Sequence, residues 1–227
     1  MHRFIIANLK SNKTREALRS WFEDLGELQT SSAEKVILAV PYPLLTVARD
    51  EITRLNLPID LAAQDVSPFP MGAYTGEVNA DQLKEFGVTY CIVGHSERRR
   101  YFGETAEFVA KKINMLELVG IMPILCVSEE SVDSQFSALT NSDDGLIVAY
   151  EPVESIGTGK NQPVDLVSSF VKKVRLKLSN SPVLYGGSVN ELDVNEYLLV
   201  TDGVLVGTAS LDGDQFSKVI EEARVDA

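Results

Sequence analysis

The chain has 227 residues, of which 44% are hydrophobic, and its 21 Lys and Arg against 33 Asp and Glu give a formal net charge of −12. This apolar fraction is too high for a disordered chain, and the length is typical of one large α/β domain. The acidic balance argues against nucleic acid as a partner, because phosphate backbones attract basic surfaces. It also means that a site for an anionic substrate needs its own local positive charge.

The apolar segments are short. The longest mostly apolar stretch, Val36 to Ala48, contains two prolines and is shorter than the roughly 20 residues that a membrane-spanning helix needs. The N-terminal run Phe4–Ala7 is followed at once by polar residues, so it does not resemble a signal peptide. Cys91 and Cys126 lie in apolar runs, where we expect buried, reduced thiols rather than a disulfide. These features predict a cytoplasmic protein that binds neither membranes nor nucleic acid.

Short runs rich in β-branched residues alternate with longer amphipathic segments along the whole chain. Each run is apolar at consecutive positions, as expected for strands of a sheet that is covered on both faces. The predicted strands are Phe4–Ala7, Val36–Val40, Ile59–Ala63, Tyr90–Val93, Met122–Val127, Leu146–Tyr150, Pro182–Tyr185 and Val204–Val206.

The segments between these strands carry helical signals. Thr14–Leu28 and Pro163–Leu178 repeat apolar residues at spacings of three and four, and other helices end near Val119 and at Phe86, the latter capped by Asn79 or Asp81. Only Ser128 to Asp144 separates the fifth and sixth strands, which predicts a shortened fifth helix. Eight β-then-α units in a chain of this length favour a single (β/α)₈ barrel domain over residues 1–227 rather than a doubly wound sheet.

Polar side chains and glycine turns follow several of the predicted strands. In a parallel barrel the carboxyl ends of all strands open onto one face, where active sites lie. The residues brought there are Asn8 and Lys10 after the first strand, His95 and Glu97 after the fourth, Glu151 after the sixth, Gly186 to Ser188 after the seventh, and Gly207 and Thr208 after the eighth. We take this convergence as stronger evidence for an active site than any one motif.

Each candidate has a functional and a structural interpretation. His95 precedes the first turn of a predicted helix, whose N-terminus keeps an imidazole neutral and able to donate a hydrogen bond; the alternative is a structural hydrogen-bonding histidine. Burial of Glu151 under residues 152–160, which we expect to form a lid, raises its pKa and suits a general base, whereas a solvated carboxylate is the alternative. Lys10 at the barrel mouth supplies the positive charge that the acidic chain requires; the alternative is an ordinary surface lysine. Cys126 faces the same mouth, where packing is favoured over reactivity.

The order of these motifs resembles the triosephosphate isomerase family over essentially the whole chain. The matching segments are Asn8-Leu9-Lys10, Gly94 to Arg99, Tyr150–Val153 followed by Ile156–Lys160, Tyr185–Val189 and Val206–Leu211, with Gly72 to Glu77 in the position of the family's dimer loop. The resemblance implies interconversion of dihydroxyacetone phosphate and D-glyceraldehyde 3-phosphate through an enediolate, in glycolysis and gluconeogenesis, without a metal or cofactor.

The resemblance also implies roles for individual residues. Glu151 moves a proton between C1 and C2 and neutral His95 polarises the carbonyl, a pairing for which this family is itself the reference case. Lys10 and Asn8 bind the substrate. Glu97 orders Lys10, and Cys126 has a supporting position. The phosphate-binding backbone N–H groups belong to Gly157, Ser188, Gly207 and Thr208, and a homodimer is implied through Thr75, Glu77 and Arg98.

The chain departs from the family pattern at three positions. Glu154 and Ser155 stand where the family usually has Trp and Ala, and Thr208 replaces a glycine in the last turn. Glycine is favoured where φ is positive, so threonine is either strained there or lies at negative φ with its hydroxyl near the phosphate. We expect the second arrangement.

Two other functions compete with this interpretation. Gly157-Thr158-Gly159-Lys160 superficially suggests a nucleotide-binding P-loop, but Glu154 and Asn161 occupy positions where that motif requires Gly and Ser or Thr. A non-catalytic barrel that acts as a scaffold is disfavoured because Asn8, Lys10, His95 and Glu151 are all present.

Overall fold

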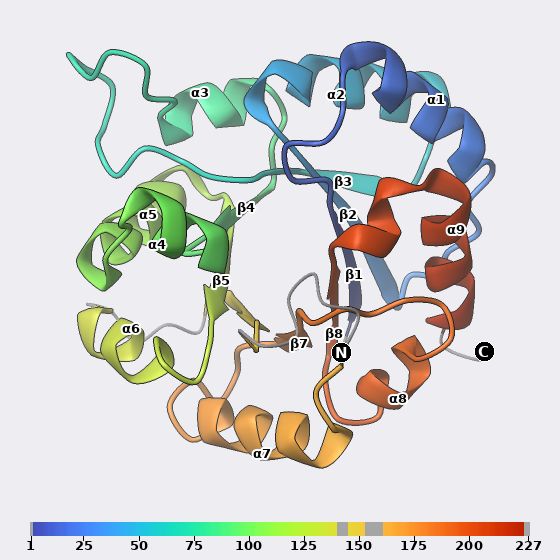
Figure 1. Cartoon of the computed structure of the whole chain (residues 1–227). Coiled ribbons are helices and arrows are strands. Elements are labelled where there is room, and N and C mark those ends of the chain that lie inside the picture. Colours follow the sequence, from blue (N-terminus) through green and yellow to red (C-terminus); the bar gives the residue numbers. More distant parts are fainter. Residues whose placement is uncertain (1, 140–144, 153–160, 225–227) are drawn as a thin grey trace.

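The computed structural model describes residues 2–139, 145–152 and 161–224, in which eight parallel strands close into a barrel in chain order. Helices surround this barrel on the outside (Figure 1). The strands are β1 (Arg3–Asn8), β2 (Glu34–Val40), β3 (Ile59–Ala63), β4 (Tyr90–Val93), β5 (Met122–Val127), β6 (Ile147–Tyr150), β7 (Val183–Tyr185) and β8 (Gly203–Val206). The predicted (β/α)₈ barrel is confirmed, and each predicted strand agrees to within two residues at either end.

Some of the helices begin at a capping side chain, and some end at a glycine with positive φ. The helices are α1 (Arg15–Leu25), α2 (Leu45–Arg54), α3 (Ala80–Glu85), α4 (Ser96–Phe102), α5 (Ala106–Val119), α6 (Val132–Ala138), α7 (Val164–Arg175), α8 (Val194–Leu198) and α9 (Gly213–Glu222), with 3₁₀ turns η1 (Tyr42–Leu44) and η2 (Thr208–Leu211). Asn79, rather than Asp81, caps α3 through a capping box with Gln82. α1 ends earlier than predicted because Gly26 takes up a φ of 67°.

Alternate strand residues pack on opposite sides of the barrel wall. One set fills the interior and includes Ile6, Ile92 and Cys126. The other set, which includes Cys91, faces the helices and belongs to the same apolar cluster as helix residues such as Trp21 of α1. Burial on both sides explains the continuous apolar runs of the strands. Both cysteines are buried and free, and no helix in the described part of the chain is long and apolar enough to cross a membrane.

The predicted short fifth helix is confirmed as α6, which has seven residues and no side-chain cap. Its Gln135 is fully buried and joins three helices. The Gln135 side chain accepts a hydrogen bond from Arg99 of α4 at 2.7 Å and donates one to the carbonyl of Ala106, the first residue of α5, at 3.2 Å. This one side chain therefore connects the short helix α6 to α4 and α5.

Candidate active site

The carboxyl ends of five strands bring most of the predicted site residues around one pocket. Its walls are formed by Asn8, Lys10, His95, Glu151, Gly186, Gly187, Ser188, Leu205, Gly207 and Thr208. Residues 153–160 of the expected lid lie outside the described residues, and these include Glu154, Ser155 and Gly157. The barrel topology thus brings together residues that are up to two hundred positions apart in sequence.

His95 and Glu151 contact each other at the centre of this pocket. His95 Nε2 lies 2.9 Å from Glu151 Oε1, and both side chains are almost fully buried. The other carboxylate oxygen accepts a hydrogen bond from the backbone N–H of Ser96 at 3.0 Å. The Nδ1 atom of His95 accepts a hydrogen bond from the backbone N–H of Glu97 at 3.2 Å, in the first turn of α4. Because Nδ1 is an acceptor, this geometry corresponds to a neutral imidazole that carries its proton on Nε2.

The electrostatics of this pair differ from the sequence prediction for both groups. Burial raises the pKa of Glu151, but His95 and the Ser96 N–H stabilise the carboxylate, and the net pKa is lowered. The predicted rise is therefore wrong for this arrangement. Burial lowers the pKa of His95, but the Glu151 carboxylate outweighs this effect and raises it. The neighbour, rather than burial, decides the direction for both groups.

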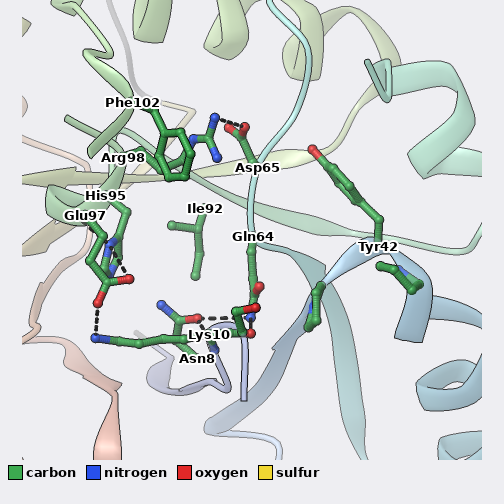
Figure 2. Close-up of a pocket in the computed structure, with 13 residues that line it drawn as sticks. Asn8, Lys10, Tyr42, Gln64, Asp65, Ile92, His95, Glu97, Arg98 and Phe102 are labelled. Atoms are coloured by element: carbon green, nitrogen blue, oxygen red, sulfur yellow. Dashed lines mark hydrogen bonds and ion pairs between the residues drawn. The ribbon is translucent and has the colours of Figure 1, made fainter. Parts of the chain in front are cut away.

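Lys10 and Asn8, which also line the pocket, are held by hydrogen bonds and an ion pair. Lys10 has a φ of 50°, and its Nζ lies 2.6 Å from Glu97 Oε1. Asn8 Oδ1 accepts hydrogen bonds from the backbone N–H of Lys10 at 3.1 Å and from Gln64 Nε2 at 3.2 Å (Figure 2). These bonds occupy the oxygen of the Asn8 amide, so its NH₂ group is the part that can be presented to a ligand.

Sequence reasoning missed Gln64 and Ser96. Gln64 Nε2 also donates to the carbonyls of Lys10 and Ala39, each at 3.0 Å, so it joins the ends of β1, β2 and β3. Both missed residues come within three positions of a strand's carboxyl end, β3 for Gln64 and β4 for Ser96. A position just after the carboxyl end of a strand is therefore the sequence signal that could have identified both residues.

The turns after β7 and β8 form the remaining wall. A Cβ at Gly187 would lie 2.2 Å from Tyr185 Oη, and one at Gly186 would lie 3.1 Å from Glu151 Cγ, so neither position has room for a side chain without a shift. Thr208 begins η2, and among the described residues only Lys10 and Asn56 are non-glycine residues with positive φ. Threonine is therefore not in the strained conformation, and it is exposed at the pocket.

Cys126 is fully buried in the barrel interior next to Glu151. Burial, and to a lesser extent the Glu151 carboxylate, raises the pKa of its thiol well above the ordinary value. A thiol in this state is a poor nucleophile, which favours packing over reactivity. No cluster of three or more His, Cys, Asp or Glu side chains suited to a metal ion occurs within the described ranges.

A second cavity of about 300 Å³ adjoins the first through Asn8, Lys10 and His95, which line both, and it is also lined by Glu97. Its outer wall is partly apolar and includes Tyr42 and Phe102 (Figure 2). Arg98 also lines this cavity, and its guanidinium forms 2.9 Å ion pairs with Asp65 and Glu104 of its own chain.

The segment between β3 and α3 extends outward from the barrel (Figure 1). Its tip is exposed and includes the predicted Thr75 and Glu77 as well as Met71, which is 69% exposed. Within the segment Phe69 stacks on Tyr74 with the ring centroids 4.4 Å apart. Thus a structured loop presents an exposed apolar tip rather than lying on its own barrel.

Comparisons with known proteins agree with the geometry of this site. Residues 3–223 match the family model described as triosephosphate isomerase. The triosephosphate isomerase of Thermus thermophilus is 38% identical, with 98% of this chain and 100% of that protein aligned. That of Trichodesmium erythraeum is 38% identical over 97% of this chain and 99% of its own length, and that of a Synechococcus strain is 36% identical over 95% of each.

Proposed function

The chain belongs to the triosephosphate isomerase family, and we propose that Glu151, His95, Lys10 and Asn8 carry out its reaction. As a member of this family it is an intramolecular isomerase that interconverts dihydroxyacetone phosphate and D-glyceraldehyde 3-phosphate, a step of glycolysis and gluconeogenesis. The observation that carries the assignment of residues is the 2.9 Å contact between the buried Glu151 and His95 at the barrel mouth.

In the proposed mechanism Glu151 is the general base that moves a proton between C1 and C2. Both of its oxygens are engaged, one by His95 and one by the Ser96 N–H, so one contact has to be released before the carboxylate can take a proton from carbon. His95 donates its Nε2 proton to a carbonyl oxygen of the substrate. The backbone donor at Nδ1 supports this role because it favours the neutral ring.

Lys10 and the turns after β7 and β8 are proposed to bind the charged parts of the substrate. The Lys10 ammonium group pairs with Glu97, and Lys10 lines the pocket, where its charge would compensate the negative charge of an enediolate in a chain of net charge −12. Backbone N–H groups of Ser188, Gly207 and Thr208, together with Gly157 from outside the described residues, are the proposed phosphate donors. Asn8 contributes its amide, and Glu97 and Cys126 have supporting roles.

A coupled assay with D-glyceraldehyde 3-phosphate tests this assignment. We expect Glu151→Gln to remain folded and to lose at least about 100-fold in kcat, because it removes general-base catalysis. Glu130→Gln is the matched control, since Glu130 is exposed after β5 and is outside the proposed machinery. A folded Glu151→Gln enzyme within about tenfold of the wild type would refute the assignment of the base.

We propose further that the active species is a homodimer. The exposed tip around Thr75 and Glu77 would enter the partner's second cavity, next to Asn8 and Lys10. An apolar cavity wall and an exposed apolar loop tip on the same chain support this arrangement. The ion pairs of Arg98 with Asp65 and Glu104 would hold the base of the loop in position.

The proposal also covers the cellular location and the domain organisation of the enzyme. We propose that the enzyme acts in the cytoplasm, for which the two buried free thiols are supporting evidence. We also propose that residues 1–227 form one catalytic domain with a small phosphorylated triose and a second copy of the chain as its partners. The proposal includes neither nucleic acid nor membrane.

A further inference from the structure

Two stacked tyrosines hold the backbone of Gln162, which lies just before α7. Tyr185, the last residue of β7, and Tyr197 of α8 have ring centroids 4.1 Å apart and planes inclined by 18°. The Gln162 N–H donates to Tyr185 Oη at 2.9 Å, and Tyr197 Oη donates to the Gln162 carbonyl at 2.9 Å. Each tyrosine therefore satisfies one of the two polar groups of the same peptide residue.

Tyr185 is also in close contact with the turn proposed to bind phosphate. A Cβ at Gly187 would be 2.2 Å from Tyr185 Oη and 2.4 Å from its Cζ, so the ring lies directly against the backbone of that turn. Tyr185 is fully buried, and Tyr197 is 3% exposed. A shift of the Tyr185 ring would therefore displace Gly187 and the Ser188 N–H that follows it.

Asp193, which precedes α8, strengthens the same connection. One carboxylate oxygen of Asp193 accepts from the backbone N–H of Asn190 at 2.9 Å, and the other accepts from the Asn161 side-chain amide. In turn, the Val189 N–H donates to the Gly187 carbonyl at 2.9 Å. The Asp193 carboxylate thus connects the loop that follows the turn to the start of α8 and to Asn161.

We propose that Tyr197 is a positioning residue for the substrate phosphate, acting through the ring of Tyr185 on the Gly187–Ser188 turn. This inference rests on the assignment of that turn as a phosphate site in the proposed function. Tyr197 lines neither cavity at the barrel mouth, so its effect is indirect. We therefore expect substitutions at Tyr197 to weaken the binding of the phosphate dianion much more than they slow proton transfer at the substrate carbons.

The test uses Tyr197→Phe, which removes the hydrogen bond to Gln162 but keeps the stacked ring, and Tyr197→Leu, which removes both. Tyr90→Phe is the control, because Tyr90 begins β4 at the opposite end of the barrel. Three quantities are measured: KM for D-glyceraldehyde 3-phosphate, the competitive inhibition constant of inorganic phosphate, and kcat/KM for unphosphorylated D-glyceraldehyde. Circular dichroism and thermal melting verify that each variant is folded.

For Tyr197→Phe we expect KM and the phosphate inhibition constant to rise about 2–10-fold, which corresponds to the loss of one hydrogen bond. Tyr197→Leu should show a larger rise. In both variants kcat/KM for D-glyceraldehyde should stay within about twofold of the wild type, and Tyr90→Phe should change none of the three.

Unchanged phosphate inhibition in both folded Tyr197 variants would overturn the proposal and leave Tyr197 a core residue. An equal loss of activity on D-glyceraldehyde would also overturn it, since the effect would then not be specific to phosphate. If phosphate does not inhibit the wild type competitively, the assignment of the turn itself fails, which separates that failure from a failure of Tyr197 alone.

Discussion

The carboxylate of Glu151 experiences opposing influences in the folded chain. Its position after an apolar strand was enough to predict that it lies at the barrel mouth, but the sequence left open whether it is buried or solvated there. The direction of its pKa could not be predicted in this way, because it depends on where His95 Nε2 and the Ser96 N–H lie. A sequence shows which groups reach the same mouth, but hydrogen bonds between groups from different strands depend on the closed barrel.

Thr208 illustrates a case in which the sequence left two conformations open. Its place in η2 excludes the strained alternative, so its hydroxyl can add a hydrogen bond to a bound phosphate. We expect Thr208→Gly to weaken phosphate binding by about 0.5–1.5 kcal/mol, the contribution of one such bond.

Steady-state kinetics of Thr208→Gly provide the measurement. KM should rise more than kcat falls, because a phosphate contact acts in both the ground state and the transition state. A Thr208→Gly enzyme with a lower KM and a higher melting temperature would show that threonine strains the turn, and would contradict our interpretation.

At the scale of secondary structure, strands were predicted more accurately than helix ends. The strands are continuous apolar runs, and burial on both faces leaves little ambiguity about their limits. The end of α1 at Leu25 was overestimated because the apolar period continues to Leu28, while Gly26 ends the helix through its positive φ. The three-helix junction at Gln135 was not predicted, since a glutamine inside a weakly periodic segment does not indicate burial.

The junction at Gln135 leads to a prediction about stability. Gln135→Leu removes the acceptor at 2.7 Å from the half-buried Arg99 guanidinium and the donor to Ala106. An unpaired buried donor costs about 1–3 kcal/mol, and more when the group is charged. Urea unfolding should show a loss of this size for Gln135→Leu and a smaller loss for Gln135→Glu, which keeps an acceptor for Arg99. Equal stability of Gln135→Leu and the wild type would show that the junction contributes nothing to stability.

At the scale of the whole molecule, the loop between β3 and α3 has an exposed apolar tip that its own barrel does not cover. Thr75→Arg places a charge at this tip, and burying an unpaired charge in a partner's cavity is strongly unfavourable. Light scattering should then give a mass near 24.9 kDa for the variant and near twice that value for the wild type.

We expect the monomeric Thr75→Arg variant to lose at least about tenfold in activity, because the cavity beside Asn8 and Lys10 is left open to water. Leu199→Arg is the control, since Leu199 is 84% exposed at the end of α8, and it should remain a fully active dimer. A fully active wild-type monomer would contradict the dimer proposal.

The central claim is that Glu151 transfers a proton between two carbons of the substrate, and the most direct test is exchange with solvent. Dihydroxyacetone phosphate is incubated with enzyme in D₂O, and deuterium on the carbons next to the carbonyl is followed by proton NMR. A carboxylate base that equilibrates with water predicts deuterium incorporation by the wild type and at least about a 100-fold slower incorporation by folded Glu151→Gln. Isomerisation and deuterium incorporation by folded Glu151→Gln at the rate of the wild type would contradict the claim.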